Sequence, residues 1–193
     1  MEKISFLGCG SWGGALGSIL AEKNFGVTMW HRNDVVTRSL NETRVHYLIP
    51  ELKFPKIVNF TNNISSAIRS ANVIVLAIPS QSIRKLLTDN KSDFNQDQLI
   101  VNVSKGIEVD TLMTVSEVIN DVLGTAYNKA VTLSGPSHAE EVVQNHPTTL
   151  VAASSDLEAA QKIQDLFASD MLRTYRNKDI KGVELGGSMK NVI

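Results

Sequence analysis

The chain has 193 residues, of which 42% are hydrophobic and 20% charged, values typical of a globular protein with one well-developed core. Its formal net charge of −1 argues against a nucleic-acid partner or an anionic membrane surface. The single cysteine, Cys9, excludes an internal disulfide framework, and the short, glycine-broken apolar stretch at the N-terminus is not typical of a signal peptide or membrane span, so we expect a cytoplasmic protein without stable membrane insertion.

Short apolar runs alternate with segments of helical periodicity, a pattern typical of a parallel sheet covered by helices. Strands are predicted at 4–7, 27–30, 56–60, 73–78, 99–103, 130–133, 149–153 and 172–175. Helices are predicted from the first glycine loop to Asn24 and at 35–40, 63–69, 110–123, 137–144 and 156–168. We therefore predict an α/β fold of the Rossmann type, a doubly wound, mostly parallel sheet with flanking helices.

The final stretch, residues 179–193, has the pattern of a helix that has begun and not ended, because no glycine cap or helix breaker follows it. We expect a dinucleotide-binding domain over residues 1–178. Residues 179–193 are then the start of a helix leading into a further, truncated helical domain for the substrate.

A glycine-rich loop follows the first predicted strand and opens a helix, which is the context of a dinucleotide-binding fingerprint. Gly8, Gly10 and Gly13 have the spacing G-x-G-x-x-G. In that fingerprint the first glycine allows a tight turn, the second admits a pyrophosphate, and the third lets the helix pack against the strand. The helix N-terminus would present free N–H groups to the anion. A purely structural glycine turn is the alternative.

The end of the second predicted strand bears on which dinucleotide binds. A carboxylate there favours NAD by bonding the ribose 2′-hydroxyl, whereas an arginine accommodates the 2′-phosphate of NADP. The sequence continues with His31 and Arg32 and has no acid until Asp34. The guanidinium of Arg32 can pair with a phosphate bidentately, although it can also be a solvated loop residue. NADP(H) is therefore favoured, with NAD(H) as the second choice.

Four blocks of the sequence, in order, resemble those of bacterial NAD(P)-dependent glycerol-3-phosphate dehydrogenases. They are G-C-G-S-W-G-G-A-L from residue 8, N-V-S-K-G-I-E over 102–108, L-S-G-P-S-H-A-E-E over 133–141 and G-V-E-L-G-G-S-M-K-N-V-I over 182–193. The resemblance covers the whole chain. It departs at Gly14, where the family usually has Thr or another small residue, and at Ser188 and Met189, where Ala-Leu is common. Family members also carry a further helical domain.

The resemblance implies reversible hydride transfer between NAD(P)H and dihydroxyacetone phosphate, giving sn-glycerol 3-phosphate for phospholipid synthesis. It implies Lys190 as proton donor and acceptor and a homodimer for the full-length protein. The implied cofactor contacts are Ser11, Trp12, Arg32, Tyr47, Lys105 and Ala139, and the implied substrate contacts are Lys105, Gly135 and Ser137. We expect the 193-residue chain alone to turn over poorly, because closing the site needs the further domain.

The residues themselves suit this chemistry, because reduction of a ketone needs a positioned acid. Lys105 lies between a strand end and Gly106, at the carboxyl edge of the predicted sheet, and Lys190 follows three small residues. Repulsion from Lys105 would lower the pKa of Lys190. Ser137 is expected to cap a helix and to offer its hydroxyl to the substrate. Taken without the resemblance, each of these residues is also readily explained as a solvated lysine or a plain helix cap.

Four histidines, His31, His46, His138 and His146, show no partner pattern, so no metal and no histidine base is proposed. Two other functions stay open. One is a related dehydrogenase that acts on 3-hydroxy acids or 6-phosphogluconate. The other is a non-catalytic NADP-binding module, against which the retained lysines argue.

Overall fold

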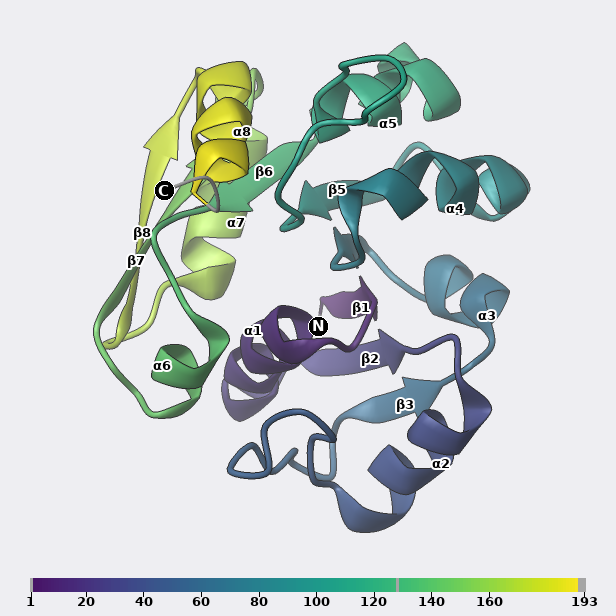
Figure 1. Ribbon diagram of the computed structural model, residues 1–193, viewed down its shortest axis with the longest axis vertical. Helices are drawn as coiled ribbons and strands as arrows, with labels where there is room; N and C mark the ends of the chain where they lie inside the picture. The colour runs from purple at the N-terminus through teal and green to yellow at the C-terminus, as the bar shows by residue number, and fades with distance from the viewer. Residues whose placement is uncertain (1, 128, 191–193) are drawn as a thin grey trace.

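The computed structural model describes residues 2–127 and 129–190 and has one eight-stranded sheet in the order β3-β2-β1-β4-β5-β6-β7-β8 (Figure 1). The strands are β1 (Lys3–Leu7), β2 (Gly26–Trp30), β3 (Asn59–Thr61), β4 (Val73–Leu76), β5 (Leu99–Asn102), β6 (Val131–Ser134), β7 (Thr148–Ala153) and β8 (Leu172–Asn177). Neighbouring strands are parallel except for β6 and β7, which are antiparallel. The predicted Rossmann-type, mostly parallel sheet is confirmed.

Helices connect most of the strands. They are α1 (Ser11–Glu22), α2 (Asp34–Thr43), α3 (Ile64–Arg69), α4 (Ile83–Asp89), α5 (Val115–Leu123), α6 (Ala139–Val143), α7 (Leu157–Phe167) and α8 (Ile180–Met189). Residues 191–193, which end the last sequence block and the predicted final helix, lie outside the described residues. Asp179 caps α8, since its side chain accepts a hydrogen bond from the N–H of Gly182.

Four elements differ from the sequence predictions. Helix α4 was not predicted; it is only seven residues long, and Ser82 before it makes no side-chain capping bond that would mark its start. Helix α5 begins at Val115 instead of residue 110, because Thr114 and Glu117 form a capping box there. Strand β3 spans 59–61 rather than 56–60, and β4 ends at Leu76.

The sheet is buried on both faces, because successive residues of its central strands pack into different core clusters. In β4, Val73 and Val75 belong to one cluster, whereas Ile74 and Leu76 belong to the other. The first cluster includes α1 and α7, and the second includes α3, α4 and α5. This double burial explains the continuous apolar run in the sequence.

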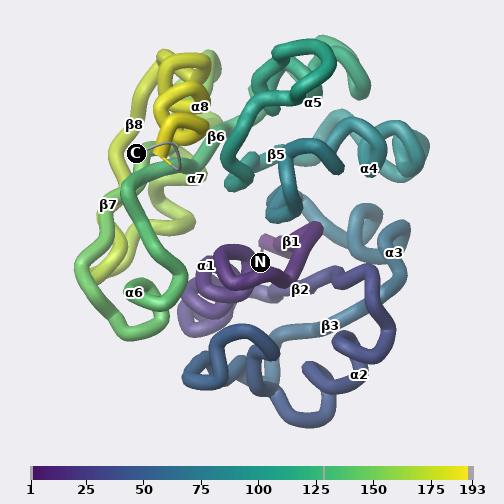
Figure 2. The backbone as a smooth tube through the Cα atoms, viewed as in Figure 1, coloured from purple at the N-terminus to yellow at the C-terminus, as the bar shows by residue number. Residues whose placement is uncertain are grey.

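The sheet topology determines where a ligand can bind. The chain runs from β1 outward to β2 and β3 and returns to β4 on the other side of β1. In open α/β sheets the crevice at the carboxyl ends of the strands, where the strand order reverses, is the ligand site. The loops after β1, β4, β5 and β6 all reach that edge. Figure 2 shows the segment of residues 44–58 between α2 and β3 folded back beside α1.

Among the residues that the structure describes, no helix has both the length and the apolar character needed to cross a membrane.

Candidate active site

A cleft of about 410 Å³ opens at this edge of the sheet, between the glycine loop, the loops after β4 and β5 and the start of α6. Most of the predicted site residues line it: Gly10, Ser11, Trp12, Gly13, Lys105, Ser137 and Ala139. Gly135 and Lys190 line a neighbouring pocket of about 320 Å³ between β6 and α8. Residues that lie far apart in the sequence thus meet at one place.

The glycine loop forms a close turn from β1 into α1. Gly8 has a φ of +122°, and a Cβ at this position would overlap the carbonyl oxygen of Ala77. Gly10 is the N-cap of α1, and a Cβ there would meet nothing within 4 Å, so the backbone is open to an incoming group. Ser11 and Trp12 begin the helix, and the indole Nε1 of Trp12 is buried without a partner in the described part of the chain. A cradle with exposed backbone at a helix N-terminus is suited to a pyrophosphate.

Lys105 and Lys190 come from different elements and reach the same loop. Lys105 Nζ donates a hydrogen bond to the carbonyl oxygen of Gly135 at 3.1 Å. Lys190 Nζ donates to the carbonyl oxygen of Ser137 at 2.6 Å. Both side chains are partly buried. The structure therefore places two amines beside the loop that follows β6, next to the cleft.

The two amines are close enough to repel each other, as the sequence predicted. Burial and the positive charge of Lys190 lower the pKa of Lys105 to about 8. The sequence-based expectation had the repulsion acting on Lys190. An amine with a pKa near neutral pH exchanges protons readily under physiological conditions.

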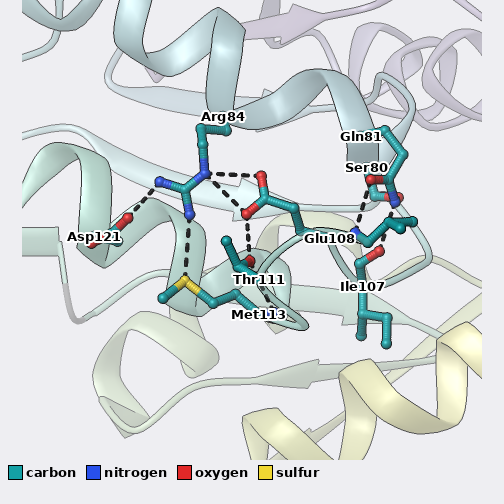
Figure 3. A network of polar contacts seen from close by, with 9 residues as sticks. Ser80, Gln81, Arg84, Ile107, Glu108, Thr111, Met113 and Asp121 are labelled. Carbon is teal, nitrogen blue, oxygen red and sulfur yellow. Dashed lines mark hydrogen bonds and ion pairs between the residues drawn. The ribbon is translucent and has the colours of Figure 1, made fainter.

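The loop after β5, which carries Lys105, is held by side chains from the region of α4 (Figure 3). Arg84 Nε donates to both carboxylate oxygens of Glu108 at 2.9 Å, and its Nη1 donates to Asp121 at 2.5 Å. Hydrogen bonds from Arg84 hold the pKa of Glu108 below its usual range. Gln81 Nε2 also donates to the carbonyl of Ile107 at 2.7 Å. Sequence reasoning missed Gln81 and Arg84, because the helix that bears Arg84 was not predicted.

The loop after β6 corrects one sequence prediction. Ser137 does not cap α6, because that helix begins at Ala139 with His138 as its N-cap and has no side-chain capping bond. Ser137 is instead buried, and its N–H donates to the carbonyl of Gly135 at 3.0 Å. Its position in the wall of the cleft leaves the expected contact with substrate as a prediction.

A buried carboxylate, Glu184, fastens α8 to the sheet. It accepts hydrogen bonds from the N–H of Ser116 at 3.0 Å, the hydroxyl of Ser116 at 2.6 Å and the hydroxyl of Thr132 at 2.8 Å. Asn102 Nδ2 adds a longer contact at 3.3 Å. Glu184 is 5% exposed and lies less than two turns before Lys190. Sequence reasoning missed this residue, although it stands in the last of the four blocks.

The other predicted cofactor residues lie at the end of β2 and on the segment beside α1. Tyr47 is 42% exposed, and its Oη lies 3.4 Å from His31 Nε2. Arg32 is exposed, and its positive charge acts on Tyr47. Asp34, the first acid after β2, pairs with Arg38 at 2.7 Å. The carboxylate of Asp34 is therefore paired with Arg38. Arg32 forms no ion pair within residues 2–127 and 129–190.

Within the described residues, no group of three or more His, Cys, Asp or Glu side chains could hold a metal ion. Cys9 is buried in the glycine loop, with its Sγ 3.5 Å from Met29 Sδ. Burial raises the pKa of the Cys9 thiol to about 12, so the thiol stays protonated at neutral pH and is a poor nucleophile.

Comparisons with known proteins show which family this chain resembles. The family model described as NAD-dependent glycerol-3-phosphate dehydrogenase N-terminus matches residues 3–160. Proteins named glycerol-3-phosphate dehydrogenase (NAD(P)+) from Clostridium perfringens and Lysinibacillus sphaericus are 44% and 43% identical over the whole chain. The chain spans 58% of the length of each. The crystal structure of a glycerol-3-phosphate dehydrogenase from Coxiella burnetii superposes with a TM-score of 0.93 at 28% identity, over 99% of this chain and 58% of that one.

Proposed function

The chain belongs to the NAD-dependent glycerol-3-phosphate dehydrogenase family, and from this membership and the site geometry we propose that it binds NAD(P)H and takes part in reducing dihydroxyacetone phosphate to sn-glycerol 3-phosphate. The observation that carries the proposal is the convergence of two amines on one loop beside the cleft. Lys105 and Lys190 both donate to carbonyls of residues 135–137. A non-catalytic dinucleotide module would have no use for a pair of closely placed amines at this point.

The cleft suits the dinucleotide. The turn at Gly8, the open backbone at Gly10 and the free N–H groups at the start of α1 supply the features that a pyrophosphate needs. Trp12 adds an indole N–H without a partner in the described part of the chain. When bound, the reduced nicotinamide supplies the hydride that adds to the carbonyl carbon of the substrate.

The proton that completes the reduction is assigned to Lys190. Hydride addition leaves negative charge on the former carbonyl oxygen, and an ammonium group beside it donates the proton that gives the alcohol. Lys105 binds and orients the same oxygen by its charge. Because the pKa of Lys105 is lowered to about 8, this amine is also able to exchange protons near neutral pH.

The dinucleotide preference, the location and the assembly state extend the proposal. Arg32 at the end of β2, with Asp34 engaged by Arg38, favours NADP(H) over NAD(H). We propose that the full-length protein is a cytoplasmic homodimer serving phospholipid synthesis. Residues 1–178 would form the dinucleotide-binding domain and α8 would lead into a helical domain for the substrate.

Two measurements test the function. Calorimetric titration of the chain with NADPH and with NADH should give binding, tighter for NADPH. The full-length enzyme should then consume NADPH only when dihydroxyacetone phosphate is added, and a preference for a 3-hydroxy acid or for 6-phosphogluconate would point to the related dehydrogenases instead. Lys190→Ala should abolish turnover while leaving NADPH affinity within about twofold, whereas near-normal turnover would remove Lys190 as the proton donor.

A further inference from the structure

A histidine to which the sequence assigned no role, His46, is buried beneath the glycine loop. Only 1% of its surface is exposed. Its Nδ1 accepts hydrogen bonds from the main-chain N–H groups of Leu48 and Ile49, each at 3.1 Å. A ring nitrogen that accepts hydrogen bonds carries no proton, so the proton of the neutral imidazole lies on Nε2. The fold thus selects one tautomer of this side chain.

The other ring nitrogen, Nε2, is a buried donor that makes no hydrogen bond of good geometry to the described residues. Burial lowers the pKa of His46, and the main-chain carbonyls of Cys9 and Gly10 raise it in part, so these carbonyls are polar neighbours of the ring. They belong to the glycine loop that would hold the pyrophosphate. Buried donors without an acceptor are rare in folded proteins, and each calls for an explanation.

The ring fits against α1 because residue 14 is glycine. A Cβ on Gly14 would lie 2.7 Å from both Cδ2 and Nε2 of His46, closer than such atoms approach one another. On the other side, Tyr47 stacks on the ring with the two centroids 4.9 Å apart. His46 therefore lies between the first turn of α1 and a predicted cofactor residue.

We infer that His46 is a positioning residue for the bound dinucleotide: its neutral imidazole, protonated at Nε2, joins the glycine loop to Tyr47 and holds the two in one arrangement. This inference rests on the proposed dinucleotide binding. Protonation of Nδ1 would direct a third N–H at the N–H groups of Leu48 and Ile49 and break both hydrogen bonds. The affinity for the dinucleotide should therefore fall when His46 becomes charged.

The titratable groups near the ring are Cys9, Tyr47 and His31. Burial raises the pKa of Cys9 to about 12 and raises the pKa of Tyr47 above its usual value, so both are neutral between about pH 5 and 8. The charge of His31 acts in the same direction as burial and lowers the pKa of His46. Gly14 and Phe54, which also contact the ring, do not titrate.

The test compares NADPH binding by the wild-type chain and three variants, measured by calorimetry at about pH 8 and about pH 5.5. His46→Gln keeps a donor near Nε2, His46→Asn keeps an acceptor near Nδ1, and His46→Phe keeps only the packing of a ring. We expect His46→Phe to weaken binding about tenfold at the higher pH, with partial recovery in the Gln and Asn variants. On acidification the wild type should lose more affinity than His46→Gln, but by less than about tenfold at pH 5.5, because burial keeps the pKa of His46 below its usual value of 6.5. His146→Gln, at an exposed histidine, is the matched control and should follow the wild type.

Nitrogen NMR of the wild-type imidazoles tests the tautomer without any substitution. A bare Nδ1 and a protonated Nε2 on His46 at neutral pH are expected, and a proton on Nδ1 would overturn the inference even if the variants did not fold. Equal affinity and equal pH dependence in wild type and His46→Phe would overturn it as well. A wild-type chain that bound neither NADPH nor NADH at any pH would refute the proposed function itself, and the positioning role with it.

Discussion

Replacing Glu184 should loosen the attachment of α8 to the sheet, because this carboxylate is the common acceptor of donors from three elements. In Glu184→Ala, the hydroxyls of Ser116 and Thr132 can turn to other acceptors. The main-chain N–H of Ser116 and the amide of Asn102 cannot turn as freely. Each buried donor without an acceptor costs about 1–3 kcal/mol, so we expect a loss of about 2–4 kcal/mol in the free energy of unfolding. The carboxylate also lies at the N-terminus of α5, where negative charge is favourable.

The Gln variant separates charge from shape. Glu184→Gln keeps one oxygen acceptor and nearly the same volume, so its loss should be about 1–2 kcal/mol. Urea unfolding of the chain, followed by circular dichroism, measures both variants. Glu42→Ala and Glu42→Gln, at an exposed position of α2, are the controls and should stay within about 0.5 kcal/mol of wild type. If Glu184→Ala also stayed within that range, the reasoning from buried hydrogen bonds would be refuted.

Four further predictions concern the site. Gly135→Ala should lower stability by about 1–3 kcal/mol in thermal or urea unfolding, because its Cβ would overlap the carbonyl of Thr149, and an unchanged midpoint would contradict this packing. Folding lowers the pKa of Lys105 from 10.5 to about 8, so the charged form of this amine is disfavoured in the folded state. Between about pH 8 and 10.5 the unfolded chain therefore holds a proton that the folded chain has lost. The free energy of unfolding of the wild type, minus that of Lys105→Met, should rise with pH over this range. In Lys190→Met, NMR of the methylated amine should report a higher pKa for Lys105, and no change would mean that the two amines do not interact. Arg84→Met should raise the KM for dihydroxyacetone phosphate in the full-length enzyme several-fold by freeing the loop after β5, with Lys85→Met, on the exposed face of α4, as the control.

The fold class and the glycine loop could be read from the sequence because both depend on neighbours along the chain. A run of apolar residues at 73–78 indicates a strand covered on both faces. The spacing of Gly8, Gly10 and Gly13 between a strand and a helix indicates a turn that leaves its backbone free. Helix α4 could not be read in this way, since it is only seven residues long and its N-cap, Ser82, makes no side-chain hydrogen bond.

The arrangement of the site was decided by the tertiary structure. Lys190 meets Ser137 across 53 positions of the chain, and Glu184 meets Ser116 across 68, so no local pattern records either contact. The burial of His46 against Gly14 depends on a segment that folds back beside α1. Sequence patterns determine which residues are helical, extended or buried, because those properties follow from periodicity and local sterics. Which polar groups share a buried space, and which amine has its pKa lowered, depend on distances that exist only after the strands have paired in their order.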